Sequence, residues 1–342
     1  MFFQYSYLNY LTLCITAYLG KNFRIFDKLL HFLIIFCEHN YNMFRLNYIR
    51  DGLIEEFHEG YFVQYSKKNW DNVYPYYLRS CAKPLQAALL IDYNVDLTEK
   101  ELALCCGSHS GEECHIKVAY QIRKKFGLRE ENLKCGIHKP LSKTAQNTML
   151  INGEQPTTLH NNCSGKHLGF LAICKTNGWN IDNYDEPSHP LQLEIKHKIN
   201  SMCKIKDTYP MTTDGCGVPI LSMPLFNMLE GYMSLDEKYP QIISAIKNNP
   251  YIFGGEDRLD TEIIQNSESL VAKVGAGGLC IVLNTEKKDA FVVKVNDCSM
   301  EARRIAVLEI INRLGWANIK YDNEIKTISG KVVGETEFCE TV

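Results

Sequence analysis

The alternation of apolar and polar positions predicts strands near both ends of this 342-residue chain. Residues 52–65 alternate loosely, which predicts a strand, a turn and a second strand. In the last third, the polar turn 284–289 joins two apolar runs as a hairpin, and a third run precedes them. These three predicted strands are 269–274, 279–283 and 290–295.

Between these strands, capping signals and helical periodicity predict a series of helices. Thr98 and Ser110 each begin a capping box, which a glutamate completes three residues later. Asn161–Lys166 begins another helix, which ends at Asn177–Gly178. Periodicity predicts further helices at 190–204, 222–233, 236–248 and 300–316. Strands that flank a helical middle predict an α+β fold in which both ends of the domain supply one antiparallel sheet.

Composition and charge argue against several classes of function. The chain is 45% hydrophobic and 23% charged, which is ordinary for a globular protein. Its formal net charge of −3 gives no electrostatic reason to expect nucleic acid or an anionic membrane as partner. The 14 cysteines include no C-x-x-C pair, so we expect neither a zinc ribbon nor a disulfide scaffold. Reduced thiols indicate a cytoplasmic protein.

The first 46 residues differ from the rest of the chain. They are rich in Phe, Tyr and Leu, but polar residues interrupt both apolar runs, and no positive side chain precedes Lys21. A signal peptide needs a basic start, and a membrane span needs about 20 apolar residues. We therefore favour a leader outside the domain over a peripheral helix pair, and both over a membrane anchor.

The most informative motif is Arg79-Ser80-Cys81-Ala82-Lys83-Pro84. On a helix, residues three apart share a face, so the Lys83 amine can lie beside the Ser80 hydroxyl. Burial lowers the pKa of a lysine, and its neutral amine can take the proton of a serine. The S-x-x-K spacing occurs in penicillin-recognising enzymes, but it is common, and Ser80 could simply cap a helix.

Four further segments carry more polar groups than packing requires. Gly107–Glu112 is small and polar at a helix start, with Ser108 and Ser110 as its hydroxyls; a plain N-cap explains it equally well. The segment 160–167, HNNCSGKH, places a thiol, an amine and two imidazoles at a helix N-terminus, which suits an oxyanion or a thiolate. Its plainer explanation is a capped helix with a buried cysteine.

The other two segments combine glycines with reactive side chains. Asp214-Gly215-Cys216-Gly217 presents a carboxylate and a thiol in a tight turn. Ala272-Lys273-Val274-Gly275 puts a lysine at the end of an apolar strand, in the chain position of the K-[ST]-G motif that lines the cleft of serine acylases, although the hydroxyl is missing.

In this order, the five motifs resemble the bacterial class 3, or Rhizobium etli-type, L-asparaginases of the asparaginase II family. The segment 160–167 is the most specific of them. The resemblance runs from about Tyr48 to Trp316, so we expect a catalytic domain at 47–320, an apolar leader at 1–46 and a C-terminal tail at 321–342. Cys81 and Gly277 depart from the family pattern, which has a small and an acidic residue there.

The resemblance implies a hydrolase that converts L-asparagine and water to L-aspartate and ammonia by serine–lysine acyl-enzyme chemistry. It implies a three-layer α/β sandwich of the serine β-lactamase and glutaminase type, and a homodimer. Two serine–lysine pairs are expected: Ser80 with Lys83, and Ser108 or Ser110 with Lys273. Ser110 is slightly preferred as the helix-start residue.

The resemblance also implies one zinc ion per chain, held by Cys163, Lys166 and Cys216. The residues alone favour the two cysteines together with His167, because a lysine must bind zinc as the neutral amine. Asp214 is expected to orient a metal-bound water or the substrate amino group.

The zwitterionic substrate needs cationic and anionic partners. Arg79 and Lys273 are the cations available by motif position, and Asp214 and Glu112 are the anions. Arg258 is a further candidate, with a surface salt bridge as its equal alternative. Two other functions stay open: a glutaminase or other serine acylase with the same machinery, and, more remotely, a non-catalytic zinc or thiol sensor built on the cysteines.

Overall fold

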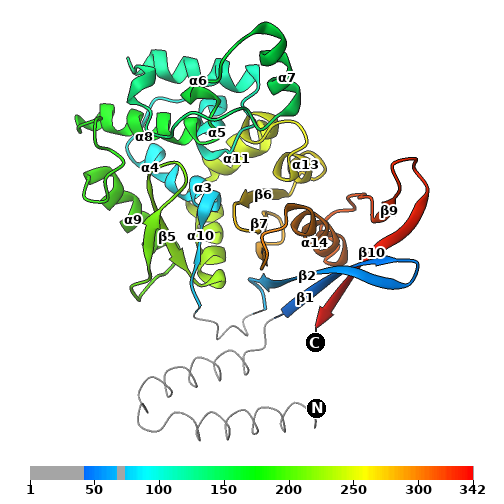
Figure 1. Cartoon of the computed structure of the whole chain (residues 1–342). Helices are drawn as coiled ribbons and strands as arrows, with labels where there is room; N and C mark the ends of the chain where they lie inside the picture. The colour runs from blue at the N-terminus through cyan, green and yellow to red at the C-terminus, as the bar shows by residue number, and fades with distance from the viewer. Residues whose placement is uncertain (1–41, 68–73, 342) are drawn as a thin grey trace, which may run out of the picture. The chain divides into compact units, whose positions relative to one another are not determined.

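The computed structural model describes residues 42–67 and 74–341. The expected leader, residues 1–46, lies almost entirely outside the described residues. Strands come from both ends of the described chain and helices from its middle, so the prediction of an α+β fold is confirmed (Figure 1).

One antiparallel sheet of seven strands joins the two ends of the domain (Figure 1). The strands from the start of the chain lie between the late hairpin and the last two strands. In spatial order the sheet consists of β6 (Leu270–Gly275), β7 (Leu279–Asn284), β8 (Asp289–Val295), β2 (Leu53–Gln64), β1 (Asn42–Arg50), β10 (Val332–Thr341) and β9 (Glu324–Lys326).

The first hairpin differs from the sequence prediction. Residues 53–64 form one continuous strand, whose partner is β1, and the turn lies at Asp51 and Gly52 with positive φ at both. Gly60 lies inside β2. A Cβ there would come within 2.6 Å of the Phe44 ring and of the Lys294 carbonyl oxygen, so glycine permits close packing rather than a turn. The prediction of a turn within 52–65 is wrong for this reason.

The expected C-terminal tail, 321–342, contributes two strands to this sheet. β10 pairs with β1 along its length, from Met43 opposite Thr341 to Arg50 opposite Gly334. Phe338 stacks on Phe44 with 5.2 Å between ring centroids, which ties the last strand to the core. The sheet therefore extends beyond the boundary that the sequence suggested at residue 320.

Both faces of the sheet are buried at β6, β7 and β8, which gives three layers there. Along β8, Phe291 and Val293 belong to the core shared with α14 (Met300–Arg313), while Ala290 and Val292 belong to the core on the opposite face. α10 (Leu225–Lys238) packs on that second face. This helix–sheet–helix arrangement follows from the two-residue period of a strand.

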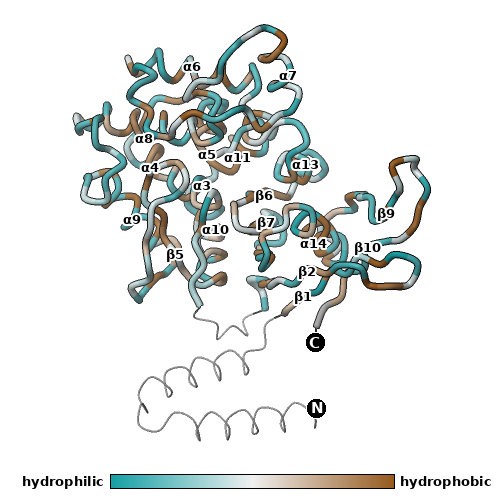
Figure 2. The backbone as a smooth tube through the Cα atoms, viewed as in Figure 1, coloured by the Kyte–Doolittle hydropathy of each residue, from teal (hydrophilic) through white to brown (hydrophobic). Residues whose placement is uncertain are grey.

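The helical region holds the motifs predicted to carry chemistry. It also contains a small sheet, in the order β3 (Tyr76–Tyr77), β5 (Pro219–Met223) and β4 (Met211–Thr213). All five residues of β5 are buried, and Figure 2 shows its mostly hydrophobic course. The 3₁₀ helices are η1 (Arg79–Ala82), η2 (Glu130–Asn132) and η3 (Thr158–His160). The remaining helices are α3 (Lys83–Gln86), α4 (Ala88–Asp92), α5 (Glu99–Cys106), α6 (Glu113–Lys125), α7 (Lys143–Asn152), α8 (Ser164–Asn177), α9 (Pro190–Met202), α11 (Pro240–Asn248), α12 (Pro250–Phe253) and α13 (Leu259–Gln265).

Two of the predicted helix caps are confirmed, and one is wrong. Thr98 forms the predicted capping box with Glu101, and Gly178 ends α8 in the left-handed conformation. Ser110, however, does not cap α6. Glu112 is the N-cap, and the Ser110 hydroxyl donates to the Gly254 carbonyl instead. Within the described residues, we find no helix with the length and apolar character that a membrane crossing requires.

Candidate active site

The S-x-x-K motif folds as the sequence predicts, into a continuous helical turn. η1 carries Ser80 and leads directly into α3, which begins at Lys83 with Pro84 in its first turn. The Lys83 backbone amide donates to the Ser80 carbonyl, so the two side chains leave the same face. Ser80 is partly exposed, whereas Lys83 is fully buried.

The Lys83 amine reaches a second serine. Its Nζ lies 2.8 Å from the Ser108 hydroxyl oxygen and 3.0 Å from the Asn162 carbonyl oxygen. Burial lowers the pKa of Lys83 from its ordinary 10.5 to about 8, with the nearby Lys166 and Lys273 acting in the same direction. About a tenth of the amine is therefore neutral near pH 7, and the neutral amine is the state that can accept a proton from a serine.

The expected pairing of Lys273 with Ser108 or Ser110 takes a different form. The Lys273 amine donates to the Val274 carbonyl at 2.8 Å and to a carboxylate oxygen of Asp260 at 3.3 Å. Among the hydrogen bonds of the described residues, the serine–lysine contact is made by Ser108 with Lys83.

The three residues expected to bind metal lie together. Cys163 precedes α8, Lys166 is in its first turn, and Cys216 comes from the glycine-flanked turn before β5. The Lys166 Nζ is 2.9 Å from the Cys216 sulfur, and the two thiols are in hydrogen-bond contact. All three are buried, with at most 6% of each residue exposed.

The electrostatics of this cluster favour one thiolate. The hydrogen bond from Cys216, together with the Lys83 and Lys166 amines, holds the pKa of Cys163 well below its ordinary value despite burial. Burial alone would lower the pKa of Lys166, but the two sulfurs outweigh it and raise that pKa. Two sulfurs and one amine in contact match the donor set of a soft divalent cation. His167 has its Nδ1 2.5 Å from the Tyr184 hydroxyl, while its buried Nε2 has no hydrogen-bond partner.

A different trio could also hold a metal ion. Glu112, Cys114 and His115 place one ligand atom each within 4.8 Å of one another, the only such group of His, Cys, Asp or Glu among the residues described. Its donors are already engaged. His115 Nδ1 accepts the Glu112 backbone N–H, and the Glu112 carboxylate accepts from the Tyr251 hydroxyl and the Glu256 backbone N–H. This trio fits a metal less well than the cysteine–lysine cluster.

The candidate substrate residues are divided between two places. Arg79 and Asp214 form an ion pair, with the Arg79 Nε 2.8 Å from a carboxylate oxygen of Asp214. Burial would raise the pKa of Asp214, but Lys166 and Arg79 lower it, so the carboxylate stays charged. Glu112 is held by Tyr251 and Glu256, as described above. The sequence predicted that a cation and an anion would lie on opposite sides of the substrate. In the structure, Arg79 and Asp214 lie side by side.

Arg258 does not form a simple surface salt bridge. Its guanidinium donates to the Ser108 carbonyl at 3.0 Å, and its Nε lies 3.9 Å from Asp260. Asp260 is the residue of this region that sequence reasoning missed. It stands two positions after Arg258 in a charged stretch that is typical of a surface loop, and only the apolar Leu259 before it and Ile263 and Ile264 after it indicate the buried helix start.

The comparisons with known proteins agree with these motifs. The model of the L-asparaginase II family matches residues 46–338. The chain belongs to the L-asparaginase II family. It is therefore an amidohydrolase that acts on asparagine. The class 3 subdivision is a finer assignment, for which the family model gives no support of its own. No curated protein sequence matched the chain.

Among solved structures the similarities are distant. A β-lactamase from Mycobacterium bovis shares 12% identity at a TM-score of 0.38, covering 81% of this chain and 98% of its own. A β-lactamase/D-alanine carboxypeptidase from Pseudomonas syringae shares 10% at 0.38, covering 84% and 98%. A D-alanine carboxypeptidase from Burkholderia cenocepacia shares 10% at 0.34, covering 82% and 96%.

Proposed function

We propose that the protein hydrolyses L-asparagine to L-aspartate and ammonia through an acyl-enzyme on Ser80. The observation that carries this proposal is the buried Lys83 amine, with its pKa lowered to about 8, one helical turn from a partly exposed serine. Ser108 and Ser110 are almost fully buried, which makes Ser80 the hydroxyl that a substrate can reach.

In the first half-reaction, the Ser80 oxygen attacks the side-chain amide carbon of asparagine while Lys83 takes the hydroxyl proton. The carbon–nitrogen bond then breaks, and the Lys83 ammonium returns the proton to the departing nitrogen, which leaves as ammonia. In the second half-reaction, a water attacks the aspartyl ester and gives a proton to Lys83, which passes it to the Ser80 oxygen as aspartate leaves. Before substrate binds, the Lys83 amine contacts the Ser108 hydroxyl and the Asn162 carbonyl, one helical turn from Ser80.

Arg79 and Asp214 are proposed to bind the two charges of the α-amino acid. Because they are adjacent and oppositely charged, an α-carboxylate at Arg79 and an α-ammonium at Asp214 would form two antiparallel ion pairs. Glu112 and Arg258 already form hydrogen bonds with other residues of the chain. They are proposed to support the segment that carries Ser108 and Ser110.

Cys163, Lys166 and Cys216 are proposed to hold one zinc ion per chain, with Lys166 binding after losing its proton. Zinc there would add positive charge beside the serines and polarise a bound water. Asp214 is 3.9 Å from the Cys216 sulfur, close enough to orient such a water.

All twelve described cysteines are free thiols, which supports a reducing, cytoplasmic setting. A homodimer is proposed from the family resemblance.

The decisive experiment measures ammonia release from L-asparagine by the purified full chain, together with the mass of the enzyme after rapid acid quench. We expect turnover and a covalent aspartyl adduct that is lost in Ser80→Ala. Equal kcat/KM values for asparagine and glutamine would favour the glutaminase alternative. No turnover of either amide, with zinc bound, would favour the sensor alternative.

A further inference from the structure

His109 is a buried residue of the serine segment, Gly107–Glu112, that the proposed catalytic steps do not use. Its ring is completely inaccessible to solvent, and both ring nitrogens have partners. Nδ1 accepts the Gly111 backbone N–H at 3.1 Å, and Nε2 lies 2.9 Å from the Ser164 hydroxyl oxygen. The Ser164 hydroxyl donates its own proton to the Leu159 carbonyl at 2.9 Å. Nε2 of His109 therefore carries the ring proton and donates it to Ser164.

The surroundings of the His109 ring keep it neutral. Burial, reinforced by the neighbouring His115, holds the pKa of His109 well below its ordinary value. A neutral imidazole has one donor and one acceptor, and in His109 each already has a partner within the protein. The ring therefore connects two parts of the chain and has no nitrogen left to exchange protons with a substrate.

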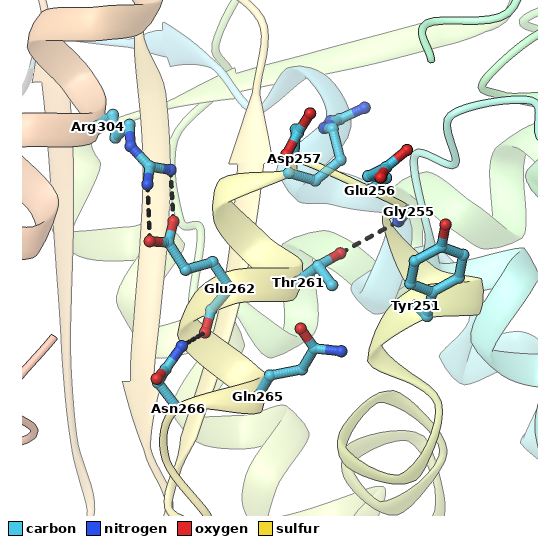
Figure 3. A pocket seen from close by; sticks show the side chains of 10 residues that line it. Tyr251, Gly255, Glu256, Asp257, Thr261, Glu262, Gln265, Asn266 and Arg304 are labelled. Atoms are coloured by element: carbon cyan, nitrogen blue, oxygen red, sulfur yellow. Dashed lines mark hydrogen bonds and ion pairs between the residues drawn. The ribbon is translucent and has the colours of Figure 1, made fainter. Parts of the chain in front are cut away.

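Two further rings hold the His109 imidazole in its plane. His115 stacks on it with 5.1 Å between ring centroids and 18° between planes, and Tyr251 stacks on His115 at 6.0 Å and 9°. His115 Nε2 also donates to the Tyr251 carbonyl at 2.8 Å. Tyr251 lines a surface pocket of about 510 Å³ (Figure 3). The stack thus runs from this pocket to the serine segment.

The residues beside this pocket also anchor the backbone of the serine segment. The Ser108 backbone N–H donates to the Phe253 carbonyl at 3.0 Å. At Gly255, where φ is +116°, a Cβ would come within 2.7 Å of the Ser110 side chain. The Gly255 backbone N–H is held in turn by the Thr261 hydroxyl at 3.1 Å (Figure 3). The main chain of the serine segment is fixed here, and the side chain of His109 links it to α8.

The bond between His109 and Ser164 closes a ring of contacts around Lys83. The Lys83 amine contacts the Ser108 hydroxyl at 2.8 Å and the Asn162 carbonyl at 3.0 Å. Ser108 is the chain neighbour of His109, and Asn162 comes two residues before Ser164, the first residue of α8. The His109–Ser164 bond therefore joins the two segments that hold the amine, and it sets the spacing between the two partners of that amine.

We propose that His109 is a positioning residue, which fixes the serine segment against the start of α8 by donating to Ser164. The Lys83 amine, which is held between these two segments, is thereby kept in place to take the proton of Ser80. This inference rests on the proposed function, and it gives His109 no contact with the substrate. A displacement of about 1 Å in a reacting group can lower a rate by about a hundredfold, so a bond that fixes the base has a measurable effect on kcat.

The test compares two variants of His109 in the asparagine assay. His109→Gln places an amide N–H at the position of Nε2–H, whereas His109→Asn keeps an acceptor for Gly111 but is too short to reach Ser164. We expect His109→Gln to keep kcat within about tenfold of wild type. His109→Asn should lose about a hundredfold in kcat with less than about a threefold change in KM, because the substrate contacts are unchanged.

Ser164→Ala removes the same bond from the other side. It should lower kcat by about the same factor as His109→Asn. The double variant should be no worse than the weaker single variant, because both substitutions break one interaction.

His189 provides the matched control. It is also buried, its Nδ1 accepts the Leu191 backbone N–H at 3.1 Å, and its Nε2 lies 2.9 Å from the Asn180 carbonyl oxygen. This pattern is that of His109, but His189 is the N-cap of α9 and contacts neither serine segment nor Lys83. His189→Asn should lower the melting temperature and leave kcat unchanged. An equal loss of kcat in His189→Asn and His109→Asn would reduce the role of His109 to general stability.

A second measurement covers the possibility that the His109 variants do not fold. The ring ¹⁵N signals of His109 in the full-length wild type should show a protonated Nε2 and an unprotonated Nδ1. In Ser164→Ala, a smaller change, the Nε2–H should exchange faster with solvent. The opposite tautomer, or an unchanged signal in Ser164→Ala, would contradict the proposed bond.

The outcomes separate this inference from the proposed function. A wild-type kcat in His109→Asn, a loss in His109→Gln as large as in His109→Asn, or additive losses in the double variant would overturn the inference while asparagine hydrolysis stands. Absence of asparagine turnover in the wild type would overturn the proposed function and, with it, the positioning role of His109.

Discussion

Arg79 and Asp214, 135 residues apart in the chain, form an ion pair of 2.8 Å directly beside the nucleophile motif. Arg79 adopts a positive φ of 47°, which an arginine rarely takes without a reason. Its guanidinium is about one-third exposed, while the Asp214 carboxylate is nearly buried. Arg79 is thus partly open to solvent and lies next to Ser80. The pair can therefore open and bind the two opposite charges of a zwitterionic substrate instead of each other.

Arg79→Gln should therefore raise the KM for asparagine by about ten- to a hundredfold with a smaller change in kcat, because it removes ground-state binding of the α-carboxylate. Steady-state kinetics check this. Arg50→Gln is the matched control, since Arg50 forms an ion pair with Glu55 on the exposed hairpin far from the motif. A loss confined to kcat would instead place Arg79 in the chemical step.

Ser80→Ala should lower kcat by several orders of magnitude, roughly 10³-fold or more, with the fold intact, because no acyl-enzyme can form. Ser108→Ala should cost less, since Ser108 positions the Lys83 amine without bonding to substrate. Ser201→Ala, at an exposed position near the end of α9, serves as control. If Ser80→Ala kept activity within about tenfold of wild type, the nucleophile would have to be another hydroxyl.

The rate should rise with pH through the pKa of Lys83. The ordinary value of 10.5 falls to about 8 in the folded protein, so the fraction of neutral amine grows from about a tenth near pH 7 to about half near pH 8. We expect kcat/KM for asparagine to increase about fivefold over that unit. The same depression links to stability: the folded state binds fewer protons, so this group stabilises it above the unfolded pKa and loses that effect as pH falls through about 8. A profile that stays flat between about pH 6.5 and 9 would exclude Lys83 as the base.

Metal content should depend on the cysteine–lysine cluster. Purified wild type should hold close to one zinc per chain, and Cys163→Ser or Lys166→Met should reduce it severalfold, because each removes one of the three proposed protein ligands. Elemental analysis gives the stoichiometry. Cys298→Ser, which changes an exposed free thiol, is the control and should bind zinc normally. Full zinc in Cys163→Ser with loss in Cys114→Ser would move the metal to the Glu112–Cys114–His115 trio.

Glutamine should be a poor substrate. It is one methylene longer than asparagine, and a closed pocket rejects that difference by about 1–3 kcal/mol on size alone, or roughly 5- to 150-fold in kcat/KM. Competition between the two amides in one reaction measures the ratio directly.

Local motifs were predictable from the sequence, and tertiary burial was not. Ser80 and Lys83 are three residues apart on one helical turn, so their proximity follows from helix geometry. Cys216 reaches Lys166 across 50 residues, and only the order of motifs in a known family indicated that meeting. Asp260 and Gly60 show which features cannot be predicted from the sequence. Both residue types are ordinary in surface loops, and only packing of distant elements makes one a buried counter-ion and the other a site of close strand contact.

The pairing of β1 with β10 also bears on how the protein is made. Among the described strands of the sheet, β1 is synthesised before all the others, and its neighbour β10 is synthesised after them. Until residues 332–341 are synthesised, β1 keeps one row of backbone hydrogen-bonding groups unsatisfied, an open edge of the kind that pairs with other chains. A chain that stops before residue 332 would therefore carry an open β1 edge that can pair with other chains.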